Sequence, residues 1–91
     1  MIRAHLIVHG KVQGVNFRYY FSKLAQQMDI CGWIQNGNSW EEVEAVVEGD
    51  ETKVRDLINW CWKGPPRAEI KGVKTTMEKY RGEFTKFKIK S

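Results

Sequence analysis

The stretch of sequence that decides the fold is residues 10–18, GKVQGVNFR. It separates an alternating, strand-like run from a run with helical periodicity. Two glycines and a terminal arginine are typical of a loop that closes around an anion, because a helix N-terminus and successive loop N–H groups can converge on one oxyanion. Arg18 adds a planar fork of donors that matches phosphate or carboxylate. The stretch therefore predicts binding of a phosphoryl group.

The segments that flank this loop carry the periodicity of strands and a helix. Residues 2–9 are β-prone and mostly apolar, as in a strand at the centre of a sheet. After the loop, apolar residues recur at helical spacing to about Asp29. Residues 30–36 predict a second strand, and residues 37–39, Gly-Asn-Ser, predict a turn.

The second half of the chain predicts two more strands, a helix and a short final strand. Residues 43–48 alternate between mostly apolar and acidic positions, which predicts a strand with one core face and one solvent face. Asp50 is a good N-cap for a second helix that ends at Gly64. Residues 67–77 predict a weaker strand. In residues 85–89 and beyond, alternating lysines mark a solvated face or a protected sheet edge.

The order β-α-β-β-α-β plus a short strand matches the split βαβ, ferredoxin-like pattern. We expect an α+β sandwich in which two helices cover one face of an antiparallel sheet. The 91 residues correspond to a single domain, residues 1–91. Because this topology serves many chemistries and many binding modules, function has to be argued from the site.

Composition sets further limits on function. The formal net charge is +4 and the pI is near 9.2, which favours anionic partners but is also ordinary for a soluble surface. No apolar run approaches about 18 residues, so no membrane span is expected. Cys31 and Cys61 form no CxxC motif, so we expect no metal site and, by default, reduced thiols in a cytoplasmic protein, with one disulfide as the alternative.

Several other polar residues favour structural roles. His5 and His9 lie on one face of the first strand, but no Cys, Asp or Glu cluster joins them at metal-ligand spacing. Cys61 lies on the apolar stripe of the second helix, which favours core packing over nucleophilic catalysis. Glu42 and Glu44 fall on the solvent face of their strand, with no electrostatic partner implied.

The residues near the loop are compatible with few types of reaction. The loop is neither a Walker A motif nor a GxGxxG fingerprint, and no neighbouring Asp or Glu is available to hold Mg²⁺. Backbone N–H groups, Arg18 and Asn36 can stabilise charge and orient water but exchange protons poorly. They suit an acyl phosphate, because its leaving carboxylate has a pKa of about 4 and needs no proton. From spacing alone, a glycine-rich turn, a surface arginine and a turn asparagine remain alternatives.

These motifs closely resemble the acylphosphatase family. The resemblance rests on GKVQGVNFR at residues 10–18 and GWIQN at residues 32–36, and continues through residues 43–49, 64–66 and 82–84. It covers essentially the whole chain. It implies a ferredoxin-like fold and hydrolysis of the carboxyl–phosphate bond without a metal or other cofactor.

The resemblance also implies roles for individual residues. Arg18 falls on the family's phosphate-binding arginine, and Asn36 on the asparagine that positions the attacking water. Asn16 departs from the Gly or bulky apolar residue common in the family, but Asn tolerates unusual φ values. Residues 37–42 form a segment one residue longer than the family pattern. The phosphate cradle falls on the backbone N–H groups of Gln13, Gly14, Val15, Asn16 and Phe17.

We therefore expect a small, monomeric, cytoplasmic acylphosphatase that needs no cofactor. Its substrate is expected to be a small-molecule acyl phosphate and its product inorganic phosphate, with no nucleic-acid or membrane partner. Two other classes stay open: a phosphate-binding or regulatory module with little turnover, and a small nucleic-acid-binding domain. Against the last, the sequence lacks an RNP-like aromatic pair on adjacent strands.

Overall fold

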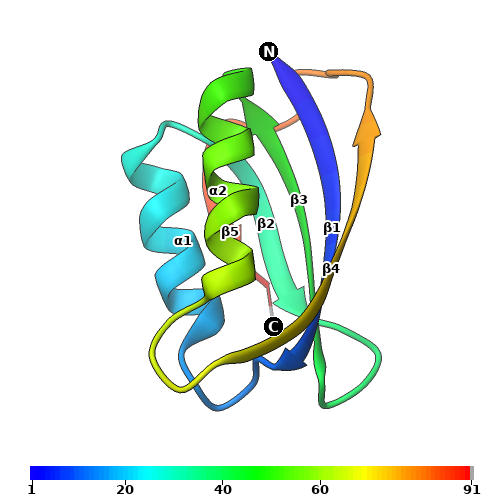
Figure 1. The fold of residues 1–91 in the computed structure, drawn as a ribbon. Coiled ribbons are helices and arrows are strands. Elements are labelled where there is room, and N and C mark those ends of the chain that lie inside the picture. Colours follow the sequence, from blue (N-terminus) through cyan, green and yellow to red (C-terminus); the bar gives the residue numbers. More distant parts are fainter. Residues whose placement is uncertain (91) are drawn as a thin grey trace.

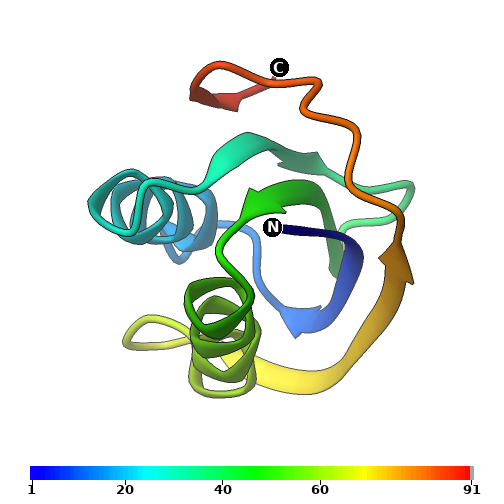
Figure 2. The ribbon, with the colours of Figure 1, turned by 90° about the horizontal axis from the view of Figure 1, so that it is seen from above.

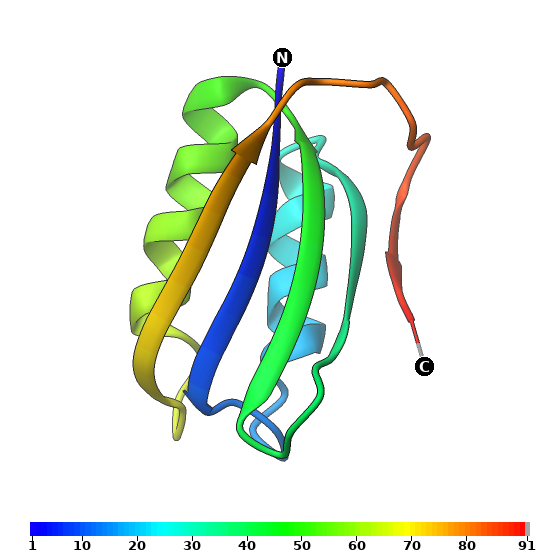
Figure 3. The same cartoon turned by 90° about the vertical axis from the view of Figure 1, so that its right-hand side faces the viewer.

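The computed structural model describes residues 1–90. Five strands form one sheet in the order β4-β1-β3-β2-β5, and both helices pack on the same face of it (Figure 1 and Figure 2). The opposite face carries no helix (Figure 3). In chain order the elements are β1 (Ile2–Lys11), α1 (Phe17–Gln27), β2 (Cys31–Asn36), β3 (Glu42–Gly49), α2 (Glu51–Lys63), β4 (Glu69–Glu78) and β5 (Phe87–Ile89).

The expected ferredoxin-like α+β fold is confirmed, with one correction to the sheet. Strands β4, β1, β3 and β2 are antiparallel neighbours, whereas β5 pairs in parallel with β2. The chain leaves β4 at one edge, crosses the end of the sheet and returns along the other edge (Figure 3). Because β4 runs opposite to β2, this return aligns β5 with β2. The sheet is therefore mixed, and the lysine-rich strand is an edge strand as expected.

The core lies between the sheet and the two helices. Alternate residues of β1 point into it, so Ala4, Leu6 and Val8 are buried. The ring of Phe21 lies 5.6 Å from that of Phe87 and 6.3 Å from that of Trp60, which joins α1 to β5 and α2. Aromatic pairs at these separations each contribute about 0.5–1.5 kcal/mol beyond burial of their area. The core thus fixes where α1 begins relative to β5.

Both cysteines are free, as the sequence predicts for reduced thiols. Cys61 is buried in the core, so its expected packing role is confirmed, and burial raises the pKa of its thiol to about 12. A thiol with such a pKa stays protonated and is a poor nucleophile. Within residues 1–90, no helix is long and apolar enough to span a membrane.

The helix-free face carries a partly buried ionic network, centred on Arg3 and Glu48, that holds the connection to β5. Arg3, at 7% exposure, donates to Glu48 (3.3 Å), Glu78 (2.9 Å) and Glu83 (2.7 Å). Glu48, at 3% exposure, also accepts the backbone N–H groups of Arg81 (2.8 Å) and Glu83 (2.9 Å). These bonds fix the connection after β4 and, through it, the position of β5.

The two histidines have structural partners that the sequence interpretation missed. His5 Nε2 lies 2.6 Å from Glu44 Oε2, and His9 Nε2 lies 3.1 Å from Glu42 Oε1. The hydrogen bond to His5, aided by one from Gln35, holds the pKa of the Glu44 carboxyl below its ordinary value. The expectation that Glu42 and Glu44 lack electrostatic partners was wrong, because their partners come from the neighbouring strand β1.

Candidate active site

The predicted anion loop, residues 12–16, joins β1 to the first turn of α1. Gly14 has φ 77° and Asn16 has φ 62°, whereas Val15 between them has no positive φ. The left-handed region favours glycine and is tolerated by asparagine, so the departure at Asn16 preserves the loop as expected. Alternation between left-handed and ordinary backbone turns successive N–H groups toward one side, which forms a concavity for an anion.

The amides at the start of α1 are open. Asn16 is the N-cap residue, but its side chain makes no capping hydrogen bond and no acidic residue lies in the first turn. The first helical bond runs from Tyr20 N–H to the Asn16 carbonyl, at 3.1 Å. Across residues 1–90, no backbone carbonyl accepts an N–H group from positions 14–19. The partial positive charge of the helix start is therefore available to a ligand.

Arg18 adds a full positive charge to this helix start. In the part of the chain that the structure describes, no carboxylate lies within ion-pair distance of its guanidinium. A cation in the first turn of a helix is unfavourable by itself, because the macrodipole already places positive charge there. An anion bound between Arg18 and the amides would reverse that cost.

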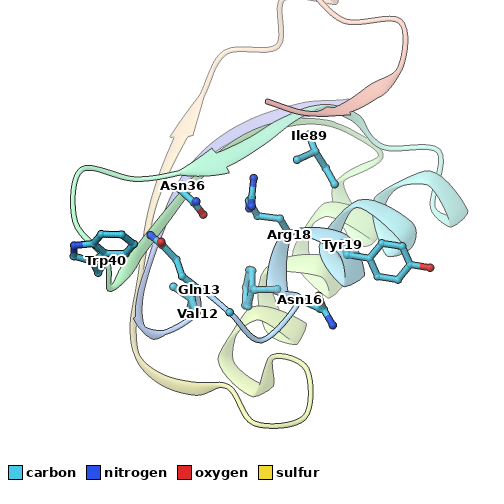
Figure 4. A pocket seen from close by; sticks show the side chains of 10 residues that line it. Val12, Gln13, Asn16, Arg18, Tyr19, Asn36, Trp40 and Ile89 are labelled. Atoms are coloured by element: carbon cyan, nitrogen blue, oxygen red, sulfur yellow. The ribbon is translucent and has the colours of Figure 1, made fainter. Parts of the chain in front are cut away.

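Arg18 and the loop line one cavity of about 510 Å³ (Figure 4). Arg18 points into the middle of the view, and Asn36 enters from the end of β2. Among the lining residues in the described part of the chain, Arg18 has the only charged side chain. The cavity is lined by Val12, Gln13, Gly14, Asn16, Phe17, Arg18, Tyr19, Asn36, Trp40 and Ile89.

All the site residues predicted from the sequence except one lie around the same cavity. Arg18 and Asn36 share the cavity, although they lie on different elements. Val15 does not line it, since its side chain is 7% exposed and packs into the core. Only the backbone N–H of Val15 is therefore open to a role in binding. The other predicted loop residues that line the cavity are Gln13, Gly14, Asn16 and Phe17.

Comparison with known proteins assigns the chain to a family. The family model for acylphosphatase matches residues 4–89. The chain belongs to the acylphosphatase family. An acylphosphatase of Pelotomaculum thermopropionicum is 47% identical over 87 residues, which cover 96% of this chain and 94% of that protein.

Solved structures agree with this assignment. The crystal structure of acylphosphatase from Bacillus subtilis matches with a TM-score of 0.93 and 27% identity, over the whole of both chains. An acylphosphatase structure from Coxiella burnetii matches with a TM-score of 0.91 and 32% identity, over 98% of this chain and 92% of that one. The chain is an enzyme that hydrolyses acyl phosphates. A binding module with little turnover and a nucleic-acid-binding domain are not favoured.

A clamp between two loops was missed by sequence reasoning. The side-chain amide of Gln13 donates to the carbonyls of Ser39 (2.9 Å) and Glu42 (3.0 Å). Glu42 also accepts the N–H of Gly37 at 2.9 Å, next to Asn36. The anion loop of the enzyme is thus tied to the loop that follows Asn36. The sequence offers no signal for it, because both acceptors are backbone carbonyls.

Four apolar or aromatic lining residues were also missed: Val12, Tyr19, Trp40 and Ile89. Trp40 is 87% exposed and lies in the longer segment after Asn36, which was a usable signal. Ile89 comes from β5, and only the pairing of β5 with β2 brings it to the cavity. Across residues 1–90, no group of three or more His, Cys, Asp or Glu side chains is arranged to hold a metal ion.

Proposed function

We propose that the start of α1 binds the phosphoryl group of the acyl phosphate. The observation that carries this proposal comes from residues 1–90, in which the amides of the helix start have no internal acceptor and the neighbouring arginine has no carboxylate partner. In this proposal the N–H groups of residues 13–17 contact the phosphoryl oxygens, and the Arg18 fork binds two of those oxygens. The bound group is thereby held and its negative charge is balanced.

Asn36 positions the attacking water in this proposal. A side-chain amide both donates and accepts hydrogen bonds, so it can hold a water without acting as a base. The water oxygen attacks phosphorus in line with the acyl oxygen, and the bond between phosphorus and that oxygen breaks with both electrons going to the carboxylate. The water's protons pass to phosphate or solvent. Holding nucleophile and phosphorus in this geometry is a large source of rate enhancement.

The leaving group explains why no general acid is required. A carboxylate has a pKa of about 4, so it leaves near neutral pH without a proton. Within residues 1–90, the cavity lining includes no Asp, Glu, His, Cys or Lys, and Arg18 does not give up its proton. The lining chemistry therefore fits an activated substrate and fits an ordinary phosphate monoester poorly, since an alkoxide needs protonation to leave.

The finer features of the activity are proposals on the same basis. The enzyme works without a metal or other cofactor, because Arg18 and the helix start supply the positive charge that a cation would otherwise provide. It acts as a cytoplasmic monomer on a small-molecule acyl phosphate and releases inorganic phosphate, without a nucleic-acid or membrane partner.

Hydrolysis of acetyl phosphate after exhaustive chelation tests the proposal. Wild-type protein should retain its rate, and inorganic phosphate should inhibit competitively. Backbone amide NMR shifts on phosphate titration should concentrate between Gln13 and Arg18. Shifts centred on Lys86 to Lys90 would instead indicate nonspecific binding to the basic edge strand. A large loss of rate that Mg²⁺ or Zn²⁺ restores would contradict the metal-free proposal.

A further inference from the structure

The amide at the end of the Gln13 side chain has a fixed orientation. Its Nε2 donates to the carbonyls of Ser39 (2.9 Å) and Glu42 (3.0 Å), and these two bonds use both of its hydrogens. A flipped amide would place Oε1 against two carbonyl oxygens and would lose both bonds. Oε1 is therefore turned away from those carbonyls, and the two bonds hold it in place.

This Oε1 atom of Gln13 has no hydrogen-bond partner within the described structure. Across residues 1–90, no donor contacts it. Within the same residues, no buried side-chain N or O atom lacks a partner, so an oxygen without one has to be accessible to water. Gln13 thus presents a fixed acceptor with free lone pairs to a water molecule.

Gln13 and Asn36 lie where two cavities meet. Both residues line the cavity of about 510 Å³ that contains Arg18, and both line a second cavity of about 230 Å³. In Figure 4 the Gln13 side chain reaches from the anion loop toward Asn36. Asn38 and Ser39 give the second cavity polar walls, so it suits ordered water. The two side-chain amides therefore stand between the proposed phosphoryl site and a polar space that can supply water.

Two acceptors orient a nucleophilic water better than one. The water has two hydrogens, and a lone pair of its oxygen has to face phosphorus. If the Asn36 amide oxygen accepts one hydrogen and Gln13 Oε1 accepts the other, the lone pair is turned away from both amides and toward phosphorus. Neither amide takes a proton. The water's protons still pass to phosphate or solvent as the new bond to phosphorus forms.

We propose that Gln13 Oε1 and the Asn36 amide together hold the attacking water. The inference rests on the proposed role of Asn36 and adds a second side chain that touches the nucleophile. The side chain of Gln13 acts on the water, whereas its backbone N–H is part of the proposed phosphoryl site. The clamp to Ser39 and Glu42 has a catalytic purpose in this proposal, because it fixes the orientation of Oε1.

The test measures kcat for acetyl phosphate and the Ki of inorganic phosphate in wild type and three variants. Gln13→Met keeps the length of the side chain but removes the acceptor, so kcat should fall by about 10-fold while Ki changes by less than about twofold. Gln13→Lys keeps N–H donors for the two carbonyls but has no acceptor, so its kcat should fall similarly. Gln26→Met is the matched control, because Gln26 bonds Ser22 at 3.0 Å and lines neither cavity. It should keep full kcat.

A double variant shows whether the two amides act on one water. In the Asn36→Ala background, Gln13→Met should lower kcat by only about 2- to 3-fold, since groups that act as a unit are not additive. Losses that multiply in full would contradict a shared water. Wild-type kcat in a folded Gln13→Lys protein would show that only the clamp matters. A raised Ki in Gln13→Met would place this side chain in phosphate binding. Each of these results overturns the inference.

The outcomes separate this inference from the proposed function. If Asn36→Ala lowers kcat and Gln13→Met does not, the role of Gln13 is wrong while that of Asn36 stands. If Asn36→Ala keeps full kcat, both water-holding roles are wrong. The phosphoryl site at the start of α1 is judged separately, by variants of Arg18.

Discussion

The two helices of this protein begin in opposite ways. Helix α2 starts at Asp50, whose carboxylate accepts the N–H of Lys53 at 3.2 Å, and Glu51 adds a negative charge to the first turn. Helix α1 starts at Asn16, which makes no capping bond, and its first turn carries Arg18 instead of an acid. The chain neutralises the start of α2 with its own carboxylates. At α1 no carboxylate of residues 1–90 does this, which is why we propose an external anion there.

A third set of backbone amides is satisfied by a carboxylate of the same chain, as at the start of α2. The N–H groups of Arg81 and Glu83, in the connection between β4 and β5, both donate to the buried Glu48. Internal carboxylates thus satisfy amide clusters where the fold alone needs them. The open cluster is the one beside the cavity, so the proposed phosphoryl site is the place where residues 1–90 supply no carboxylate for the amides.

The largest effect is expected from removing the internal anion at Glu48. Glu48→Ala should cost about 3–5 kcal/mol of folding free energy, since it removes one partner of the buried pair with Arg3 and leaves two backbone amides of the connection without an acceptor. Glu51→Ala is the control, because its pair with Arg55 is exposed and should change stability by at most about 1 kcal/mol. Urea unfolding of both variants measures this. Equal midpoints would show that Glu48 does not hold the connection.

The next effect concerns the open helix start. Arg18→Lys should lower kcat/KM by about 10²- to 10³-fold, because an ammonium group cannot reproduce the two-pronged contact with phosphoryl oxygens. Arg55→Lys on α2 is the matched control and should keep full activity. Circular dichroism verifies that both variants fold. Near wild-type turnover in a folded Arg18→Ala protein would end the proposal that α1 binds the phosphoryl group.

Asn36 should affect the rate of hydrolysis without affecting phosphate binding at the start of α1. Asn36→Ala is expected to lower kcat by about 10²-fold through loss of nucleophile positioning. Phosphate should still stabilise this variant, by about 2.7 kcal/mol at 100 times its Kd, because the amides and Arg18 remain. Asn38→Ala, on the same loop and outside the cavity lining, is the control. If phosphate stabilisation collapses while kcat holds, Asn36 is a binding residue.

The capping contrast predicts a smaller effect on stability. Asp50→Ala should destabilise the protein by about 1 kcal/mol through loss of the bond to Lys53 N–H, with activity unchanged. Asn16→Gly removes no capping bond and keeps the left-handed backbone available, so it should change stability by only about a few tenths of a kcal/mol. Thermal unfolding of both variants decides this. A larger loss in Asn16→Gly than in Asp50→Ala would reverse the comparison.

The pH dependence of stability gives the mildest test. Burial alone would raise the pKa of Glu48, but the two amide bonds and Arg3 outweigh it, so this pKa lies below the ordinary 4.5. A carboxyl with a lowered folded pKa stabilises above its unfolded pKa and loses that contribution as pH falls through the folded value. Stability should therefore decline below about pH 4.5, and less steeply in Glu48→Gln. Urea midpoints measured between pH 7 and pH 3 test this for both proteins. If the midpoints of wild type and Glu48→Gln fall in parallel, the acid sensitivity comes from another group.

Much of the fold and part of the site were predictable from the sequence. Apolar periodicity placed the helices and strands in the order that the structure shows, because each pattern is set by neighbouring residues. Asp50 as an N-cap and Asn16 in a left-handed conformation follow from local chemistry as well. The position of Arg18 at the cavity, beside residues 12–16, was predictable for the same reason, because this loop and the helix that it starts are contiguous in the chain.

Tertiary structure alone decided what depends on residues far apart in the chain. The parallel pairing of β5 follows from a crossover that no local pattern encodes, and it brings Ile89 to the cavity. The partners of Glu44 and Glu48 depend on strand register and on where the crossover lies. The Gln13 clamp joins its side chain to carbonyls 26 and 29 positions away. Local sequence sets the backbone preferences and the apolar face of each helix and strand. Contacts between strands exist only once the sheet has formed.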